Sequence, residues 1–362
     1  MTRSRKVIFA VLCVLAMFSA GLPAASASAQ ASVPNQWGFA LVTATSGTPL
    51  PAYQAGSWPA GFTVGVTPGG VGQTYVRFPK IGIAGGVVHV TSVAPTASWC
   101  QAQRWAPSGG NMVVAVQCYR YGGTPAFTPY SIVFSQSSGT LPAPQAFGYV
   151  HHNGAGVMNQ FNSAGGTNVV SGGGVGVWTV RLPGLGSAGL AGNLQVTAVN
   201  DIQPARCKVG AWTPSAAAQL VQVRCHNATD VPLNTGWTLT YQRERAITGG
   251  ALPPHKFGYT FDNLPGNAGP YVPVPAAVNH NGQGSVNSIQ SAGAGMRLVT
   301  FAALGSSPDH VQVTAFGPGP EYCNLQSAWL VIGNTTQVRN VACYSATTRT
   351  SRPSFVSHAS LY

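Results

Sequence analysis

The sequence predicts an all-β protein built from three tandem antiparallel β-sandwich-like domains, each holding one disulfide. Three observations support this class. Blocks of sequence recur at a spacing of about 110 residues. Short runs rich in Val, Thr and aromatic residues alternate with turn sequences, and the 45 glycines and 27 prolines among 362 residues supply those turns. No segment shows sustained 3.6-residue periodicity of apolar residues, which argues against helices.

Four blocks recur in the same order and define the repeat. An aromatic–glycine–aromatic block opens each copy, at 37–39, 147–149 and 257–259. A segment containing V-R-F-P or V-R-L-P follows at 76–82 and 180–186, with a divergent version at 299–305. A strand-like run comes next, at 88–93, 194–199 and 311–316, and a pair of cysteines closes the pattern. We therefore predict domains over 31–140, 141–250 and 251–362.

Two short proline-containing linkers separate the copies, at 139–144 and 250–254. Linkers of this composition act as semi-rigid spacers. We therefore expect the three domains to form a linear array with limited freedom.

The first thirty residues have the pattern of an export signal. Arg3, Arg5 and Lys6 precede an apolar run over 7–22, and small residues with several A-x-A sites follow. We predict a signal peptide over 1–30, a secreted extracellular protein, and no membrane span after cleavage, because no later stretch is long enough to cross a bilayer. The alternative interpretation of this segment is a membrane anchor.

Six cysteines remain after cleavage, an even number that suits an oxidising compartment. The repeat selects one pairing within each copy: Cys100–Cys118, Cys207–Cys225 and Cys323–Cys343. If each pair faces across a hairpin, the turns fall midway, at Gly109, Ala216 and Gly333, all within turn-forming sequences. The alternation of side chains along a strand then places the disulfides on the apolar, core side.

These motifs resemble a tandem, disulfide-containing β-domain repeat of about 110 residues found in secreted proteins of GC-rich bacteria, a family of unknown function. The resemblance covers the whole mature chain. It implies export and repetition, and it transfers no functional residues. The third copy departs from the pattern, with Thr300 in place of the arginine and Ala302 in place of the proline.

The composition argues against an enzyme and against a cofactor. The mature chain holds only six carboxylates, and the first copy holds none, so a paired-carboxylate mechanism cannot recur in the repeat. No G-x-S-x-G motif occurs, and the disulfides use every mature cysteine. His151 and His152 are neighbours on a strand, where they face opposite ways, so we expect no metal site. Cations are scattered without a basic run, so we expect no nucleic-acid partner.

Trp105, Trp212 and Trp329 are the ligand-binding candidates, one near the tip of each cysteine hairpin. Strand alternation places Trp105 and Trp212 on the face opposite the cysteines, where an indole could stack on a sugar ring. The alternative is that each tryptophan packs on a neighbouring loop or domain.

Two further features bear on binding. Lys208 and Arg224 oppose each other across the second hairpin, but the other copies hold uncharged residues there, so no shared anion site is expected. The copies differ most at 44–73, 152–177 and 260–297, and variable loops on a common scaffold suit binding.

The sequence therefore favours a secreted, non-enzymatic, multivalent binding protein, for polysaccharide or other cell-surface material. The main alternative is an extracellular structural or protein-interaction role, as a coat component or an inhibitor. A third is an enzyme whose site is assembled between domains.

Overall fold

The computed structural model describes residues 35–137, 139–141, 143–248 and 256–362. The predicted signal peptide, the whole second linker and Pro142 of the first linker lie outside the described residues. Within them the chain is all-β, with strands joined by turns and two short 3-10 helices, η1 (Pro51–Tyr53) and η2 (Ala276–Val278). No helix among these residues is long and apolar enough to cross a membrane.

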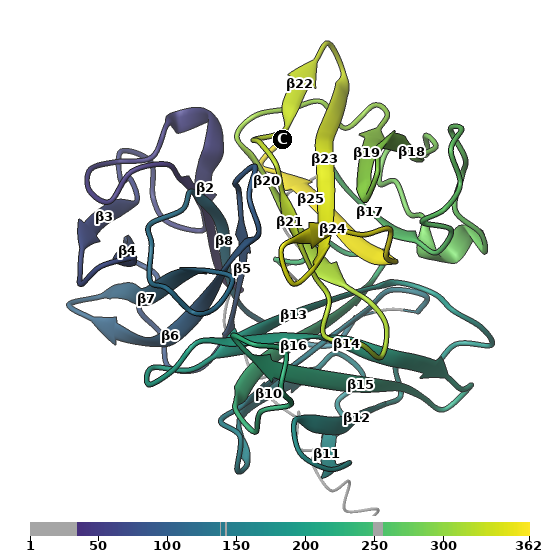
Figure 1. Cartoon of the computed structure of the whole chain (residues 1–362), viewed down its shortest axis with the longest axis horizontal. Helices are drawn as coiled ribbons and strands as arrows, with labels where there is room; N and C mark the ends of the chain where they lie inside the picture. The colour runs from purple at the N-terminus through teal and green to yellow at the C-terminus, as the bar shows by residue number, and fades with distance from the viewer. Residues whose placement is uncertain (1–34, 138, 142, 249–255) are drawn as a thin grey trace, which may run out of the picture. The chain divides into compact units, whose positions relative to one another are not determined.

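The strands form three series along the chain (Figure 1). The first is β1 (Gln36–Val42), β2 (Gln54–Gly56), β3 (Gly65–Pro68), β4 (Gln73–Phe78), β5 (Val87–Ser92), β6 (Ser98–Ser108), β7 (Asn111–Arg120) and β8 (Tyr130–Gln136). The second is β9 (Ala146–His152), β10 (Val157–Asn162), β11 (Val169–Gly172), β12 (Val177–Pro183), β13 (Asn193–Val199), β14 (Ala205–Pro214), β15 (Ala218–Asn227) and β16 (Gly236–Arg243). The third is β17 (Phe257–Asp262), β18 (Ser288–Gly293), β19 (Met296–Phe301), β20 (Asp309–Ala315), β21 (Tyr322–Leu325), β22 (Leu330–Ile332), β23 (Thr335–Ser345), β24 (Thr348–Arg349) and β25 (Ser354–Ser360).

We call these series copies 1, 2 and 3, and each makes two antiparallel sheets whose strand orders correspond. The inner sheets run β2-β1-β8-β5, β10-β9-β16-β13 and β17-β25-β20, so the third inner sheet has three strands instead of four. The hairpin sheets run β3-β4-β7-β6, β11-β12-β15-β14 and β18-β19-β23-β21. A parallel bridge between β13 and β6 joins the inner sheet of copy 2 to the hairpin sheet of copy 1 in one eight-stranded sheet. Apolar side chains from both sheets form the core of each copy, which is the sandwich-like arrangement that the alternating strands predict.

The three disulfides join the predicted partners across the predicted hairpins. Cys100 faces Cys118, Cys207 faces Cys225 and Cys323 faces Cys343 in the antiparallel registers. In the first hairpin Gly109 and Gly110 form the turn with φ of 56° and 79°, a conformation that glycine adopts without strain.

The copies do not form a linear array; the described residues belong to one compact unit. The final strand of each inner sheet, β5, β13 or β20, is buried almost throughout. One face of each strand packs into its own sandwich, and its polar face meets the polar faces of the other two. The short linkers predict a linear array of spaced domains, but the three copies pack against one another.

Backbone contacts close the three copies into a ring. A residue one or two positions after each buried strand donates its N–H to a hairpin strand of a different copy: Ala94 to Leu325 O (2.7 Å), Asn200 to Ala102 O (3.0 Å) and Gly317 to Val209 O (2.9 Å). A parallel bridge accompanies each bond, pairing Val93 with Leu325, Val199 with Ala102 and Phe316 with Val209. Copy 1 therefore contacts copy 3, copy 2 contacts copy 1, and copy 3 contacts copy 2, in a pseudo-threefold arrangement.

Side chains on the pseudo-threefold axis repeat the same cyclic pattern. His89 Nδ1 lies 3.3 Å from Thr197 Oγ1, Thr314 Oγ1 donates to Gln195 Oε1 at 2.8 Å, and Thr91 Oγ1 donates to Gln312 Oε1 at 2.9 Å. We call these six residues the polar ring. Each threonine hydroxyl also accepts a backbone N–H from the neighbouring copy, from Val90, Val196 or Val313. A buried polar group costs free energy unless it is hydrogen-bonded. The polar side chains of the ring find all of their partners only when the three copies are packed together.

Candidate functional site

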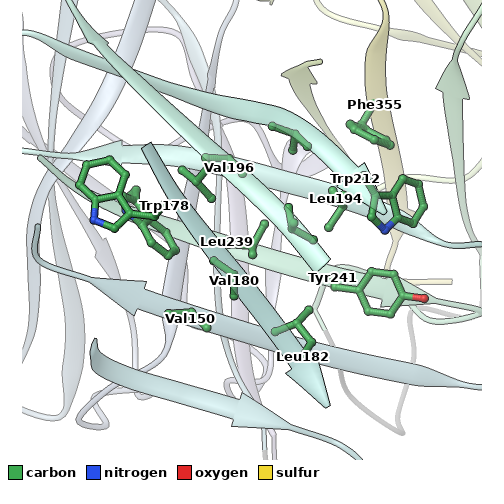
Figure 2. Packing of buried hydrophobic residues seen from close by; sticks show 14 of the residues in the cluster. Val150, Trp178, Val180, Leu182, Leu194, Val196, Trp212, Leu239, Tyr241 and Phe355 are labelled. Atoms are coloured by element: carbon green, nitrogen blue, oxygen red, sulfur yellow. The ribbon is translucent and has the colours of Figure 1, made fainter. Parts of the chain in front are cut away.

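The tryptophan candidates do not form an exposed row. Trp329 is 0% exposed and Trp212 is 7% exposed. Figure 2 shows Trp212 within the core beside Tyr241 and Phe355, and its ring centre lies 5.7 Å from that of Phe355 in copy 3. The prediction of an outward-facing Trp212 is therefore wrong, and these two residues are not available to stack on a sugar.

A β-bulge reverses the side-chain alternation that the prediction used. The register shifts between Val209 and Ala211, so Gly210 is an extra residue and Trp212 pairs with Val221 on the core side. The same shift occurs between Ala102 and Arg104 in copy 1. The glycine within the second strand was a signal of the bulge, whereas the first hairpin carries Gln103 there and gives no such signal.

Trp105 is half-buried and contacts copy 2. Its ring centre lies 4.3 Å from that of His151, and its Nε1 donates to Gly85 O at 3.0 Å. This residue therefore packs at a junction between copies, which was the alternative interpretation.

The remaining histidine and acid candidates are structural. His152 stacks on Trp237 with ring centres 5.0 Å apart, on the face opposite His151. In copy 3 the fully buried Asp309 accepts hydrogen bonds from Trp329 Nε1 (2.8 Å) and lies 3.1 Å from His358 Nε2. No group of three or more metal-ligating side chains occurs among the described residues.

Lys208 and Arg224 hold copy 3 against copy 2. Lys208 Nζ lies 3.2 Å from Glu321 Oε2, and Arg224 Nη1 donates to Pro318 O at 2.9 Å. Burial lowers the pKa of Lys208 to about 8, although Glu321 opposes this shift. Lys208 therefore already holds an acidic side chain of the protein itself, and Arg224 holds a backbone carbonyl.

An aromatic cluster surrounds Arg206 at one end of the pseudo-threefold axis. The residue before the first cysteine of each copy, Trp99, Arg206 or Tyr322, contributes to this cluster. The Arg206 guanidinium carbon lies 4.8 Å from the ring centre of Trp99 and 4.3 Å from that of Tyr322. These two contacts join copy 2 to copies 1 and 3, and an ion pair with Asp230 of its own copy holds Arg206 in place.

An open groove of about 600 Å³ lies beside this cluster, between copies 1 and 3. We call it the two-arginine groove, and it is lined by Pro95, Thr96, Ala97, Arg120, Tyr121, Tyr344, Thr347 and Arg349. The lining is mostly apolar, with the arginines as its charged groups. Apolar concave surfaces with a few polar groups are the usual form of a binding site.

Hydrogen bonds fix the aromatic side chains of the two-arginine groove. Tyr121 donates its hydroxyl to Asp230 Oδ2 at 2.9 Å, and its backbone N–H to Ala97 O at 3.1 Å. The Tyr344 ring stacks on Tyr322 with centres 5.7 Å apart, and its hydroxyl accepts from Gln326 Nε2 at 2.7 Å. These rings are held before any ligand arrives, which lowers the entropic cost of binding.

The two arginines are exposed and form no ion pair with a described carboxylate. Arg349 Nη2 donates to Gln326 Oε1 at 2.6 Å, which orients its guanidinium. Arg120 lies at the end of β7, where its backbone N–H is bonded to Thr124 O. A ligand carboxylate would therefore meet guanidinium groups that have no competing acid.

Most carboxylates of the protein are already used internally. Asp230, Asp262 and Glu321 each pair with a lysine or arginine within the fold, and Asp309 contacts Trp329 and His358. Many of the arginines, by contrast, are exposed, among them Arg77, Arg104, Arg120, Arg181, Arg339 and Arg349. The surface thus favours anionic partners.

Repeat comparison missed the two-arginine groove because its residues are not shared among the copies. The positions of Arg120 and Tyr121 correspond to Asn227 and Ala228 in copy 2, since both pairs follow the second cysteine by the same interval. A search for residues common to all copies discards such positions. The variable segments, which we expected to carry binding loops, contribute none of the lining residues.

No family model, curated protein or solved structure matches the chain.

Proposed function

We propose that this protein is an extracellular, non-enzymatic binding protein for acidic polysaccharide, and that the two-arginine groove holds the sugar. The observation that carries the proposal is the pair of exposed arginines, free of carboxylate partners, beside fixed tyrosine side chains. The face of a pyranose ring is apolar enough to pack on tyrosine and proline. A uronate carboxylate on that ring would accept hydrogen bonds from a guanidinium.

Binding of polygalacturonate should therefore exceed binding of its methyl-esterified form, which presents the same sugar without the charge. Isothermal titration calorimetry on the full mature protein measures both. The affinity should fall as salt increases, because exposed charges are screened. Equal affinity for the charged and esterified polymers would exclude a site that recognises the carboxylate.

Two matched pairs of substitutions distinguish binding in the groove from general attraction by the basic surface. Arg120→Gln with Arg349→Gln should weaken polygalacturonate binding about tenfold or more, as for the loss of charge-assisted hydrogen bonds. Arg104→Gln with Arg181→Gln removes the same charge from exposed strand positions outside the groove, and should retain most of the affinity. If both pairs of substitutions weaken binding equally, the groove is not the site.

A protein-interaction role is the second candidate, and one observation favours it. Leu330, Val331 and Ile332 in β22 are 38%, 40% and 54% exposed, and β22 pairs only with β23. An apolar strand with an open edge can pair with another chain. Sedimentation at increasing concentration tests this role, because concentration-dependent polymers would support it and a stable monomer would favour the binding role.

A further inference from the structure

A small cavity lies on the pseudo-threefold axis, between the polar ring and the aromatic cluster around Arg206. Its volume is about 50 Å³, and its walls include the first cysteine of each disulfide together with Trp99, Arg206 and Lys208. A site for one water molecule needs roughly 10–15 Å³ by the same kind of measure. The cavity therefore has room for a small ion or a few water molecules.

Two of the residues that line this cavity carry three buried N–H groups without an acceptor. Trp99 Nε1, Arg206 Nε and Arg206 Nη1 are all buried, and none has a hydrogen-bond partner among the described residues. Arg206 is only 5% exposed and Trp99 only 6%, so bulk water does not satisfy them. Buried donors without acceptors are rare in folded proteins because each costs free energy.

Among the described side chains that line the cavity, the buried polar atoms without a partner are all donors. Thr91, Thr197 and Thr314 use their hydroxyls in the polar ring, and the Ser92 hydroxyl donates to Ser98 O at 2.8 Å. The missing partner is therefore a group that accepts several hydrogen bonds and need not donate any. A water molecule accepts two and must then place its own two protons, whereas a halide ion only accepts.

The charge of the surrounding network points the same way. Arg206 pairs with Asp230, while Glu321 lies between Lys208 and Arg352. This network holds three cations and two carboxylates, so it carries one uncompensated positive charge beside the cavity. Arg352 is 45% exposed, so solvent screens part of this charge, and the remaining positive potential favours an anion in the cavity over a cation.

We propose that the axial cavity is a binding site for a small monovalent anion of the halide class, held by Trp99 Nε1 and by one free guanidinium N–H of Arg206. Copy 1 supplies the indole and copy 2 the guanidinium, while Tyr322 of copy 3 covers the guanidinium face. The anion therefore stabilises the closed arrangement of the copies, because the site exists only when they are together.

Crystals of the full mature protein grown in sodium bromide give the direct test. An anomalous bromine peak in the axial cavity, next to Trp99 Nε1 and Arg206, is the expected result. Density without anomalous signal would show that water fills the cavity, and an empty cavity would likewise overturn the proposal. This measurement uses the unaltered protein, so it does not depend on a variant that folds.

Thermal unfolding gives a second test with matched variants. At constant ionic strength, replacement of sodium gluconate by sodium chloride should raise the melting temperature of the unaltered protein, because gluconate is too large for the cavity. Trp99→Phe removes one N–H donor and keeps an aromatic ring under Arg206, so it should weaken the apparent chloride affinity about tenfold. Tyr322→Phe keeps its ring over Arg206 and loses only the hydroxyl bond to Ala346 O, so it should keep the chloride response. A chloride response that Trp99→Phe leaves unchanged, or no response at all, contradicts the proposed site.

Discussion

His89 occupies the position that Gln195 and Gln312 hold in the other copies, and all three side chains bond to a threonine of the next copy. The histidine also bonds through Nε2 to Thr240 Oγ1 at 2.7 Å. Burial lowers the pKa of His89 to about 3. This position of the repeat therefore carries an imidazole that can bind a proton in copy 1 and amides that do not titrate in copies 2 and 3.

His89→Gln should reduce the acid sensitivity of the protein. The unfolded chain binds a proton at His89 near its ordinary pKa of about 6.5, whereas the folded chain does not until about pH 3. Stability is therefore full above pH 6.5 and falls as the pH drops below it, by about 1.4 kcal/mol per pH unit for this group. Between pH 7 and pH 5 the free energy of unfolding should fall by about 2 kcal/mol less in the variant than in the unaltered protein, as measured by denaturant unfolding. Equal losses in both proteins would mean that His89 is protonated in the folded state.

The tryptophans differ in what their removal should cost. Trp212→Ala leaves a cavity among core residues of copies 2 and 3 and should lower the free energy of unfolding by about 3–5 kcal/mol. Trp105→Ala loses a half-exposed ring and one hydrogen bond, so a cost of about 1–2 kcal/mol is expected. Chemical denaturation of both variants measures the difference, and a larger cost for Trp105→Ala would contradict the burial seen here.

At the scale of elements, the cysteine hairpins combine regular pairing with a bulge. The disulfide lies on the core side before the bulge, and the bulge then turns Trp212 back toward the core. Without Gly210 a side chain would meet the Arg224 side chain, because a Cβ there would lie 2.6 Å from Arg224 Cγ. The hairpin therefore buries both its disulfide and Trp212 on the core side, whereas strict alternation along β14 would place them on opposite faces.

Removal of one hairpin disulfide should weaken the whole protein. Cys207→Ser with Cys225→Ser opens a loop of 18 residues and should lower the free energy of unfolding by about 3 kcal/mol in the chain-entropy account. The comparison is made by denaturant unfolding under oxidising conditions. A loss well under 1 kcal/mol would show that this disulfide constrains the unfolded chain little.

At the scale of the molecule, the polar ring makes the three copies dependent on one another. Each copy offers a polar strand face that finds its partners only on the next copy. Such buried networks are satisfied as a set, so loss of one member affects all. The three copies should consequently unfold together rather than one at a time.

Calorimetry of the mature protein should therefore show one transition. Thr197→Val removes the hydroxyl that bonds His89 and the Val90 N–H. It should shift this single transition to a lower temperature, with a loss of about 1–3 kcal/mol in the free energy of unfolding. Separate transitions, with only one of them moved by Thr197→Val, would show that the copies are independent.

The sequence by itself determined the all-β class, the disulfide pairing and the hairpin turns, because these depend on local pattern and on repetition. The ring closure was decided by the tertiary structure. The polar residues of β5, β13 and β20 alternate as they would in a strand that faces solvent, and only the meeting of the copies shows that they face one another. The two-arginine groove and the axial cavity have the same origin, since Arg120 and Arg349, or Trp99 and Arg206, are distant in the chain and become neighbours only when separate copies pack together.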